Sequence, residues 1–103
     1  IIQVPLKPGT IPQAIEYFNN SVGPALKEMH GFKNSRLLTN PDTNQCLMVT
    51  LWESETARLE AETNGFLQGV LKDMGSYFAE KPTIDYYQVN VQYLLILHWL
   101  GHY

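Results

Sequence analysis

The stretch GFKNSRLLTNPDTNQCLMVTLWES, residues 31–54, decides the fold, because it reads as two antiparallel strands joined by a turn. Residues 32–39 and 45–52 are both rich in the β-branched, aromatic and aliphatic residues that suit strands. The five residues between them, NPDTN, have turn chemistry, because Pro fixes φ while Asn and Asp bond their own backbone or adopt left-handed conformations. Ser54 can then cap a helix that begins at Glu55. We therefore predict a hairpin that leads directly into a helix.

Helical periodicity flanks this hairpin on both sides. Between residues 11 and 29, apolar residues recur at steps of three and four, and Gly31 is well placed to end that helix. Pro24 removes a backbone donor inside it, so we expect a kink or a division there. After the hairpin, residues 54–63 predict a short helix, and residues 66–78 predict a second one with its own apolar stripe.

Two outer strands complete the pattern. Residues 1–6 (IIQVPL) and residues 83–93 (TIDYYQVNVQY) are both β-compatible, and the second alternates apolar with polar residues. The predicted order is β-α-β-β-α-β, which is an α+β ferredoxin-like fold with a four-stranded antiparallel sheet and helices on one face. We expect one domain over residues 1–93. Residues 94–103 (LLILHWLGHY) lie outside that plan, and we interpret them as an apolar C-terminal extension that lengthens the last strand or contacts a partner subunit.

Composition narrows the class of protein. With 103 residues, 45% apolar and 17% charged, the chain is expected to be a single globular domain. Its seven basic residues are scattered and its net charge is −3, which argues against nucleic-acid binding. A single cysteine, Cys46, fits a reducing compartment. The longest apolar run, residues 94–97, is too short for a membrane span, so we expect a cytoplasmic protein with no membrane partner.

The second arm of the hairpin predicts the assembly. Cys46, Met48 and Trp52 alternate with Leu47, Val49 and Leu51, so the arm is apolar on both faces. Helices on one face of the sheet leave the other set exposed, and a contiguous apolar patch on a monomer marks an interface. We therefore predict a homodimer in which two open sheet faces meet across a two-fold axis.

Several short motifs resemble one known family. Gly31-Phe32, Leu37-Leu38, the run TLWES at 50–54 and Ala57 together resemble the antibiotic-biosynthesis-monooxygenase family of the dimeric α/β-barrel superfamily. This resemblance spans roughly residues 1–91. It implies a ligand pocket between the sheet and the helices, and a function among cofactor-independent oxygenases of polycyclic aromatics, haem-degrading enzymes or domains without activity.

The haem-degrading branch fits this sequence poorly. That branch uses an Asn on the first strand, and residues 1–6 contain none. It also uses a His on the helical segment after the third strand, and residues 54–78 contain no histidine. We therefore expect no haem and no other cofactor.

Seven residues are candidates for a substrate pocket, and each also has an ordinary structural interpretation. Trp52 could stack on an aromatic ligand or fill the core, and His30 could be an acid or base or could complement a helix dipole. Arg36 could hold an anionic group or be a solvated charge on an edge strand. The other four lie on predicted apolar stripes or on the last strand; they are Phe18, Met74, Tyr77 and Tyr86.

No catalytic residue and no metal site are predicted. His98 and His102 are four residues apart, but no third ligand is spaced to match them and Leu100-Gly101 disfavours a helix between them. Two functions therefore stay open. One is a cofactor-free monooxygenase of a small aromatic or polyketide-type substrate. The other is a non-catalytic dimeric domain that binds a small apolar ligand or only dimerises, and a sizeable pocket would favour the enzyme.

Overall fold

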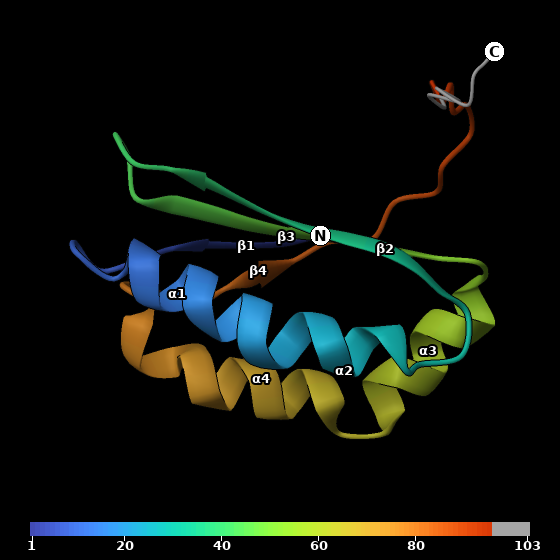
Figure 1. The fold of residues 1–103 in the computed structure, drawn as a ribbon, viewed down its shortest axis with the longest axis horizontal. Coiled ribbons are helices and arrows are strands. Elements are labelled where there is room, and N and C mark those ends of the chain that lie inside the picture. Colours follow the sequence, from blue (N-terminus) through green and yellow to red (C-terminus); the bar gives the residue numbers. More distant parts are fainter. Residues whose placement is uncertain (96–103) are drawn as a thin grey trace, which may run out of the picture.

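The computed structural model describes residues 1–95, which form one antiparallel sheet with every helix on the same face (Figure 1). The sheet order is β2-β3-β1-β4. The strands are β1 (Ile2–Pro5), β2 (Phe32–Asn40), β3 (Gln45–Trp52) and β4 (Thr83–Ile84). The helices are α1 (Ile11–Tyr17), the π-helical turn η1 (Phe18–Val22), α2 (Gly23–Lys27), α3 (Glu55–Thr63), α4 (Phe66–Met74) and the 3₁₀ turn η2 (Gly75–Tyr77). The predicted ferredoxin-like fold is confirmed. A single chain forms an open sheet, not a closed barrel.

The hairpin has the predicted form. β2 and β3 pair from Asn40↔Gln45 at the turn to Phe32↔Trp52 at the far end, with one register shift between Phe32 and Asn34. At the turn, the side chain of Asn40 accepts a hydrogen bond of 3.0 Å from the backbone N–H of Asp42. Ser54 caps α3 as predicted, because its Oγ accepts a 3.1 Å hydrogen bond from the N–H of Ala57.

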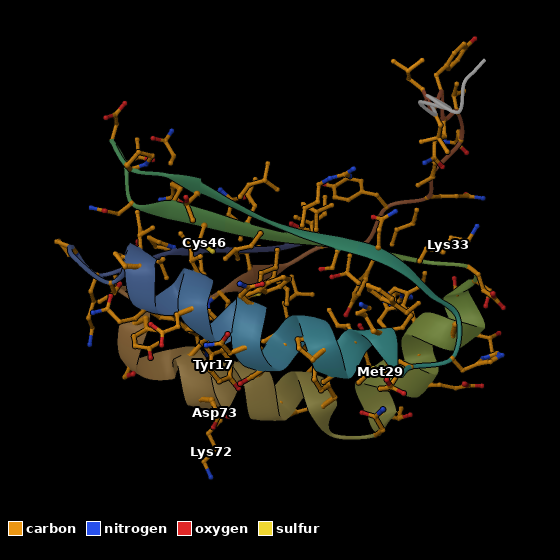
Figure 2. The ribbon with its side chains drawn as sticks, viewed as in Figure 1. Tyr17, Met29, Lys33, Cys46, Lys72 and Asp73 are labelled. Carbon is orange, nitrogen blue, oxygen red and sulfur yellow. The ribbon has the colours of Figure 1, made fainter. Side chains whose placement is uncertain are left out.

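The two faces of β3 have different surroundings. Cys46 and Met48 face the helices and are buried, and Cys46 lies between the sheet and the helical layer in Figure 2. Alternation places Leu47, Val49 and Leu51 on the opposite face, which carries no helix (Figure 1). The sheet therefore keeps an apolar face that nothing in residues 1–95 covers.

The first helical segment is divided where the proline predicts. Instead of a clean break, the chain forms the π-helical turn η1 directly before Gly23-Pro24, and the N–H of Gly23 donates to the carbonyl of Phe18. The wider π-helical turn accommodates Pro24, which has no backbone N–H to donate. Gly31 ends the segment with φ +78°, as expected of a residue just beyond a helix C-terminus.

The last strand is much shorter than predicted. We expected residues 83–93 to form it, but β4 contains only Thr83 and Ile84, which pair with Gln3 and Ile2. One further pair of backbone hydrogen bonds, 2.7 and 2.9 Å, joins Asp85 to Ile1. From residue 86 onward no described strand lies alongside, so the segment leaves the sheet and rises on its helix-free side (Figure 1). The alternating apolar pattern is real, but it has no ladder partner within residues 1–95.

The C-terminal extension is described only at Leu94 and Leu95, which are exposed and carry no regular secondary structure. The remaining eight residues, including His98 and His102, lie outside the described part of the chain. In the described part, no helix has the length and apolar character needed to cross a membrane.

Candidate functional site

The layer between the sheet and the helices is closed at one end and partly open at the other. At the closed end, Val4, Cys46 and Met48 are at most 4% exposed. At the other end, where α3 lies against the sheet, the corresponding helix-facing side chains are only partly buried; they are Ile2, Ser35, Thr50, Trp52 and Ile84. We call this second region the α3 end. Here partly exposed helix-facing side chains come from all four strands.

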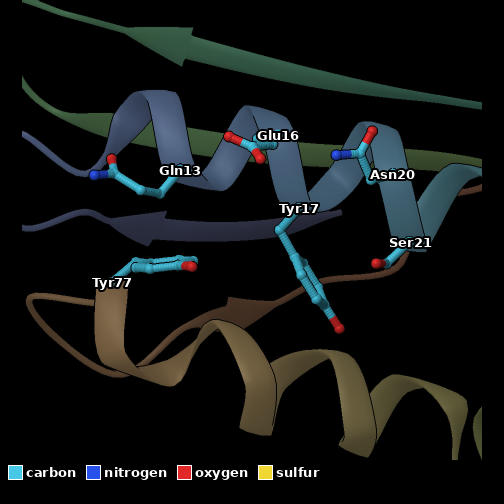
Figure 3. Close-up of a pocket in the computed structure, with 6 residues that line it drawn as sticks. All are labelled: Gln13, Glu16, Tyr17, Asn20, Ser21 and Tyr77. Carbon is cyan, nitrogen blue, oxygen red and sulfur yellow. The ribbon is translucent and has the colours of Figure 1, made fainter.

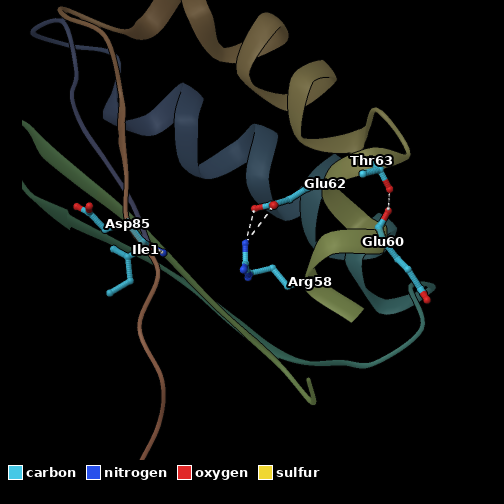
Figure 4. Close-up of polar contacts among 6 residues, drawn as sticks. All are labelled: Ile1, Arg58, Glu60, Glu62, Thr63 and Asp85. Atoms are coloured by element: carbon cyan, nitrogen blue, oxygen red, sulfur yellow. Dashed lines mark hydrogen bonds and ion pairs between the residues drawn. The ribbon is translucent and has the colours of Figure 1, made fainter. Parts of the chain in front are cut away.

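A partly buried ion pair lies on α3 at this end. The chain has seven basic and ten acidic residues, all within residues 1–95, and only Arg58 and Glu62 among them are not exposed. Nη1 of Arg58 lies 3.1 and 3.3 Å from the two carboxylate oxygens of Glu62 (Figure 4). The two side chains are 24% and 23% exposed. Charged side chains are mostly exposed in folded proteins, so this partly buried pair differs from every other charge in residues 1–95.

Tyr86 completes this group. The guanidinium carbon of Arg58 lies 3.9 Å from the centroid of the Tyr86 ring, which is a cation–π contact. A hydrogen-bonding contact with the Glu62 carboxylate, helped by partial burial, raises the pKa of the Tyr86 phenol. Arg58, Glu62 and Tyr86 form the α3 cluster. In this cluster one cation contacts both a carboxylate and an aromatic ring.

The sheet adds hydroxyl and aromatic groups on the same side. Ser35 and Thr50 share a 2.8 Å hydrogen bond between their hydroxyls. The rings of Phe32 and Trp52 meet edge to face, with centroids 5.8 Å apart and planes inclined at 77°. Together with the α3 cluster, these groups suit a flat aromatic ligand that carries hydroxyl or carbonyl oxygens.

The predicted pocket residues divide between the two ends. Trp52 and Tyr86 are at the α3 end. Phe18, Met74 and Tyr77 pack against the buried core at or toward the closed end, where the carbonyl of Tyr77 accepts a 2.7 Å hydrogen bond from Lys7. Because β3 runs the length of the sheet, the two ends are roughly 20 Å apart. The structure therefore does not bring Trp52, Tyr77 and Tyr86 into one pocket.

His30 and Arg36 lie outside the helix–sheet layer. The side chain of His30 is 79% exposed, and its Nδ1 lies 3.8 Å from a carboxylate oxygen of Glu60. Arg36 pairs across β2 and β3 with Val49 and is exposed on the helix-free face. Neither side chain is placed to touch a ligand at the α3 end.

Two hollows formed by residues 1–95 lie on the outside of the helical layer. One, about 290 Å³, is lined by polar residues of α1 and η1 with Tyr17 and Tyr77 (Figure 3). In it, the hydroxyl of Tyr17 donates a 2.7 Å hydrogen bond to Asp73. The other, about 370 Å³, lies between the end of α2 and α3 beside His30 and Glu60. Within residues 1–95, no group of three or more His, Cys, Asp or Glu side chains is arranged to hold a metal ion.

The sequence did not single out Arg58 or Glu62. One signal for this pair was present in the sequence ETARLEAET, where the two residues are four apart. Arg58 directly follows Ala57 and Glu62 directly follows Ala61, and both alanines are buried against the rest of the fold. That spacing places the pair along the border of the buried face of α3. Only the position of Tyr86, 24 residues further on, reveals that they belong to one cluster.

Similar solved structures share the fold at low sequence identity. The monooxygenase from the gene ActVA-Orf6 of Streptomyces coelicolor, in complex with nanaomycin D, is 18% identical, with a TM-score of 0.77 over 92% of this chain and 88% of that one. A protein of unknown function from Nitrosomonas europaea is 16% identical, with a TM-score of 0.73 over 92% and 90%. A proposed antibiotic biosynthesis monooxygenase from Chloroflexus aurantiacus is 14% identical, with a TM-score of 0.58 over 88% and 95%. No protein-family model and no curated sequence match the chain.

Proposed function

We propose that this chain, which has the fold of antibiotic-biosynthesis-monooxygenase-like domains, is a cofactor-independent monooxygenase that acts on a small aromatic substrate at the α3 end. The observation that carries the proposal is the partly open α3 end, where the only charged side chains of residues 1–95 that are not exposed lie on α3 and one of them, Arg58, contacts the ring of Tyr86. The solved structures share the fold, and the names of two of them as monooxygenases support the class of chemistry. The substrate and the site residues are our inference.

The reaction class follows from what such a site could offer. An electron-rich hydroxyarene that loses a proton becomes a carbanion-like anion, and this anion can reduce O₂ itself. Oxygen adds to a ring CH carbon of this anion, the peroxide takes up the released proton, and the resulting CH–OOH group loses water to leave a carbonyl, so one substrate and one O₂ give one quinone-type product and one H₂O. The protein contributes orientation, exclusion of water and stabilisation of the anion.

The α3 cluster has groups for these tasks. The Arg58 guanidinium is a permanent cation in a partly desolvated position, where its attraction for a substrate oxyanion is stronger than in water. Glu62 holds that guanidinium in place through both carboxylate oxygens. Trp52 offers an aromatic surface for the rings of the substrate.

The test is oxygen consumption with a panel of naphthols, anthrones and hydroquinones. We expect turnover of at least one anthrone- or naphthol-type compound, with one O₂ used per product. Arg58→Gln should lower kcat/KM by about a hundredfold, because removal of one stabilising donor from a preorganised oxyanion site has effects of that size. Lys72→Gln, an exposed cation on α4, is the matched control and should change nothing. A wild-type protein that consumes no oxygen with any of these compounds would exclude the oxygenase.

The second function is a non-catalytic dimeric domain. One observation favours it: the two hollows described above both lie outside the layer between the sheet and the helices. This function predicts ligand binding or dimerisation without oxygen consumption, so the same panel separates it from the first.

The assembly forms part of the proposal. We place the homodimer interface on the helix-free face of the sheet and assign residues 94–103 to the contact between subunits. A cytoplasmic location is proposed with it, on the basis of the single cysteine.

A further inference from the structure

Tyr86 is held in the α3 cluster in the way that a bound phenol would be held. One face of its ring lies against the Arg58 guanidinium, with 3.9 Å between the guanidinium carbon and the ring centroid. The carboxylate of Glu62, the residue that also fixes Arg58, raises the pKa of the Tyr86 phenol. A cation against the ring and an anionic acceptor at the hydroxyl are the two interactions that distinguish a phenol from an apolar ring.

Nothing in the described chain locks Tyr86 in that position from its C-terminal side. The last backbone hydrogen bonds of the strand are at Asp85, and residues 86–95 have no regular secondary structure. Tyr86 is itself 53% exposed, so one side of the ring faces solvent. Within one chain, its withdrawal from Arg58 therefore costs the cation–π contact and the attraction of its hydroxyl to Glu62.

We propose that Arg58 and Glu62 form a binding site for a phenol ring with a free hydroxyl, and that Tyr86 of the same chain occupies this site in the present structure. The proposal deepens the proposed function and rests on it where it identifies the phenol as part of the substrate. A phenolic ligand enters when Tyr86 leaves. The segment that carries Tyr86 thus acts as an internal competitor for the site.

The same geometry sets the chemical class of ligand. A ring without a hydroxyl leaves the Glu62 carboxylate without its donor, and an aliphatic alcohol offers no ring to Arg58. A phenol satisfies both groups at once. Hydroxynaphthalenes and hydroxyquinones present the same edge and are included in the class.

The experiment removes the Tyr86 side chain and supplies a free phenol in its place. The probe is p-cresol, which reproduces the Tyr86 side chain, and binding is followed by thermal shift and by NMR without any requirement for O₂. We expect p-cresol to bind Tyr86→Ala about tenfold more tightly than wild type, and toluene to bind that variant about tenfold more weakly than p-cresol does. Tyr87→Ala is the matched control, because it truncates the adjacent exposed tyrosine, and it should respond like wild type.

Two further variants provide results that could contradict the proposal. Arg58→Gln combined with Tyr86→Ala should lose the gain in p-cresol affinity. If Tyr86→Ala does not fold, Tyr86→Phe keeps the ring but weakens its hold, and it should still bind p-cresol more tightly than wild type. Equal binding of toluene and p-cresol, an unchanged double variant, or no p-cresol binding to either Tyr86 variant would overturn the site. Because no step needs oxygen, the site can succeed where the oxygenase fails, or fail where the oxygenase succeeds.

Discussion

At position 31, both the backbone conformation and the packing require a glycine. Its φ of +78° lies in the left-handed region, and a Cβ there would clash with Cβ of Ala57 and lie 3.2 Å from Cγ of Glu53. We expect Gly31→Ala to lower the free energy of unfolding by about 2–4 kcal/mol, since it combines left-handed strain with overpacking. Gly9→Ala is the control: Gly9 has φ +82° but no atom within 4 Å of the added Cβ, so only about 1 kcal/mol should be lost. Equal losses in urea unfolding would contradict the packing argument.

Tyr17 predicts how stability depends on alkaline pH. Burial, followed by the hydrogen bond to Asp73 and the charge of that carboxylate, raises the pKa of Tyr17 to about 12. The folded state thus favours the neutral phenol, so this contribution is fully present below about pH 10, the unfolded pKa, and is lost as the pH rises toward 12.

The matching measurement compares urea unfolding near pH 9 and near pH 11. Tyr17→Phe has no phenol to ionise, so it should lose less stability than wild type over that interval. Tyr93→Phe, at a position 93% exposed, should follow wild type. If both variants behave alike, the environment of Tyr17 does not control its ionisation.

At the residue scale, the sequence predicts roles that depend on neighbours in the chain better than roles that depend on distant ones. Gly31 and Ser54 were identified correctly, because an end of a helix is encoded within a few residues. The α3 cluster was missed, because it joins a helix to a segment 24 residues further along the chain. The sequence left two roles for Trp52, packing in the core and contact with a ligand, and its partly exposed position beside Phe32 is compatible with both.

The α3 helix shows how a single cap supports an element. It is nine residues long with two buried alanines, and the Ser54 hydrogen bond to Ala57 satisfies one of the backbone N–H groups that have no partner in its first turn. We expect Ser54→Ala to cost about 1 kcal/mol of unfolding free energy and to loosen the Arg58–Glu62 pair that α3 carries. Ser76→Ala, an exposed serine in η2, should cost less than about 0.5 kcal/mol. Indistinguishable unfolding curves for the two variants would show that the cap is unimportant.

At the scale of the elements, a strand-like sequence pattern does not ensure that a segment pairs in the sheet. The helices, the hairpin and the first strand were predicted because each has its own period or turn chemistry. Residues 83–93 alternate as clearly as the hairpin does, yet only Thr83 and Ile84 belong to the sheet. Alternation of apolar and polar residues indicates that a segment can form a strand. Hydrogen bonding in a sheet also requires a partner strand of matching length. Beyond Asp85, β1 provides none in the described part of the chain.

At the scale of the whole molecule, residues 1–95 leave two apolar surfaces uncovered, and both lie on the same side of the sheet. One is the helix-free face, built from Leu38, Leu47, Val49 and Leu51. The other is the segment after β4, where Tyr87, Val89 and Val91 are exposed and the chain rises on that same side (Figure 1). A second copy related by a two-fold axis would cover both surfaces at once, which neither the helices nor a shorter loop of the same chain can do.

Val49 tests this arrangement because it lies in the middle of β3 on the helix-free face. We expect the wild-type protein to sediment as a dimer and Val49→Asp to raise the dimer dissociation constant by about a hundredfold or more, since the charge would be buried without a partner. Ile15→Asp makes the same change at an exposed apolar residue of α1 and should leave the dimer intact. Deletion of residues 94–103 should weaken the dimer if that segment contacts the second subunit. A wild-type protein that stays monomeric at every concentration, or a Val49→Asp variant that dimerises as tightly as wild type, would place the interface elsewhere.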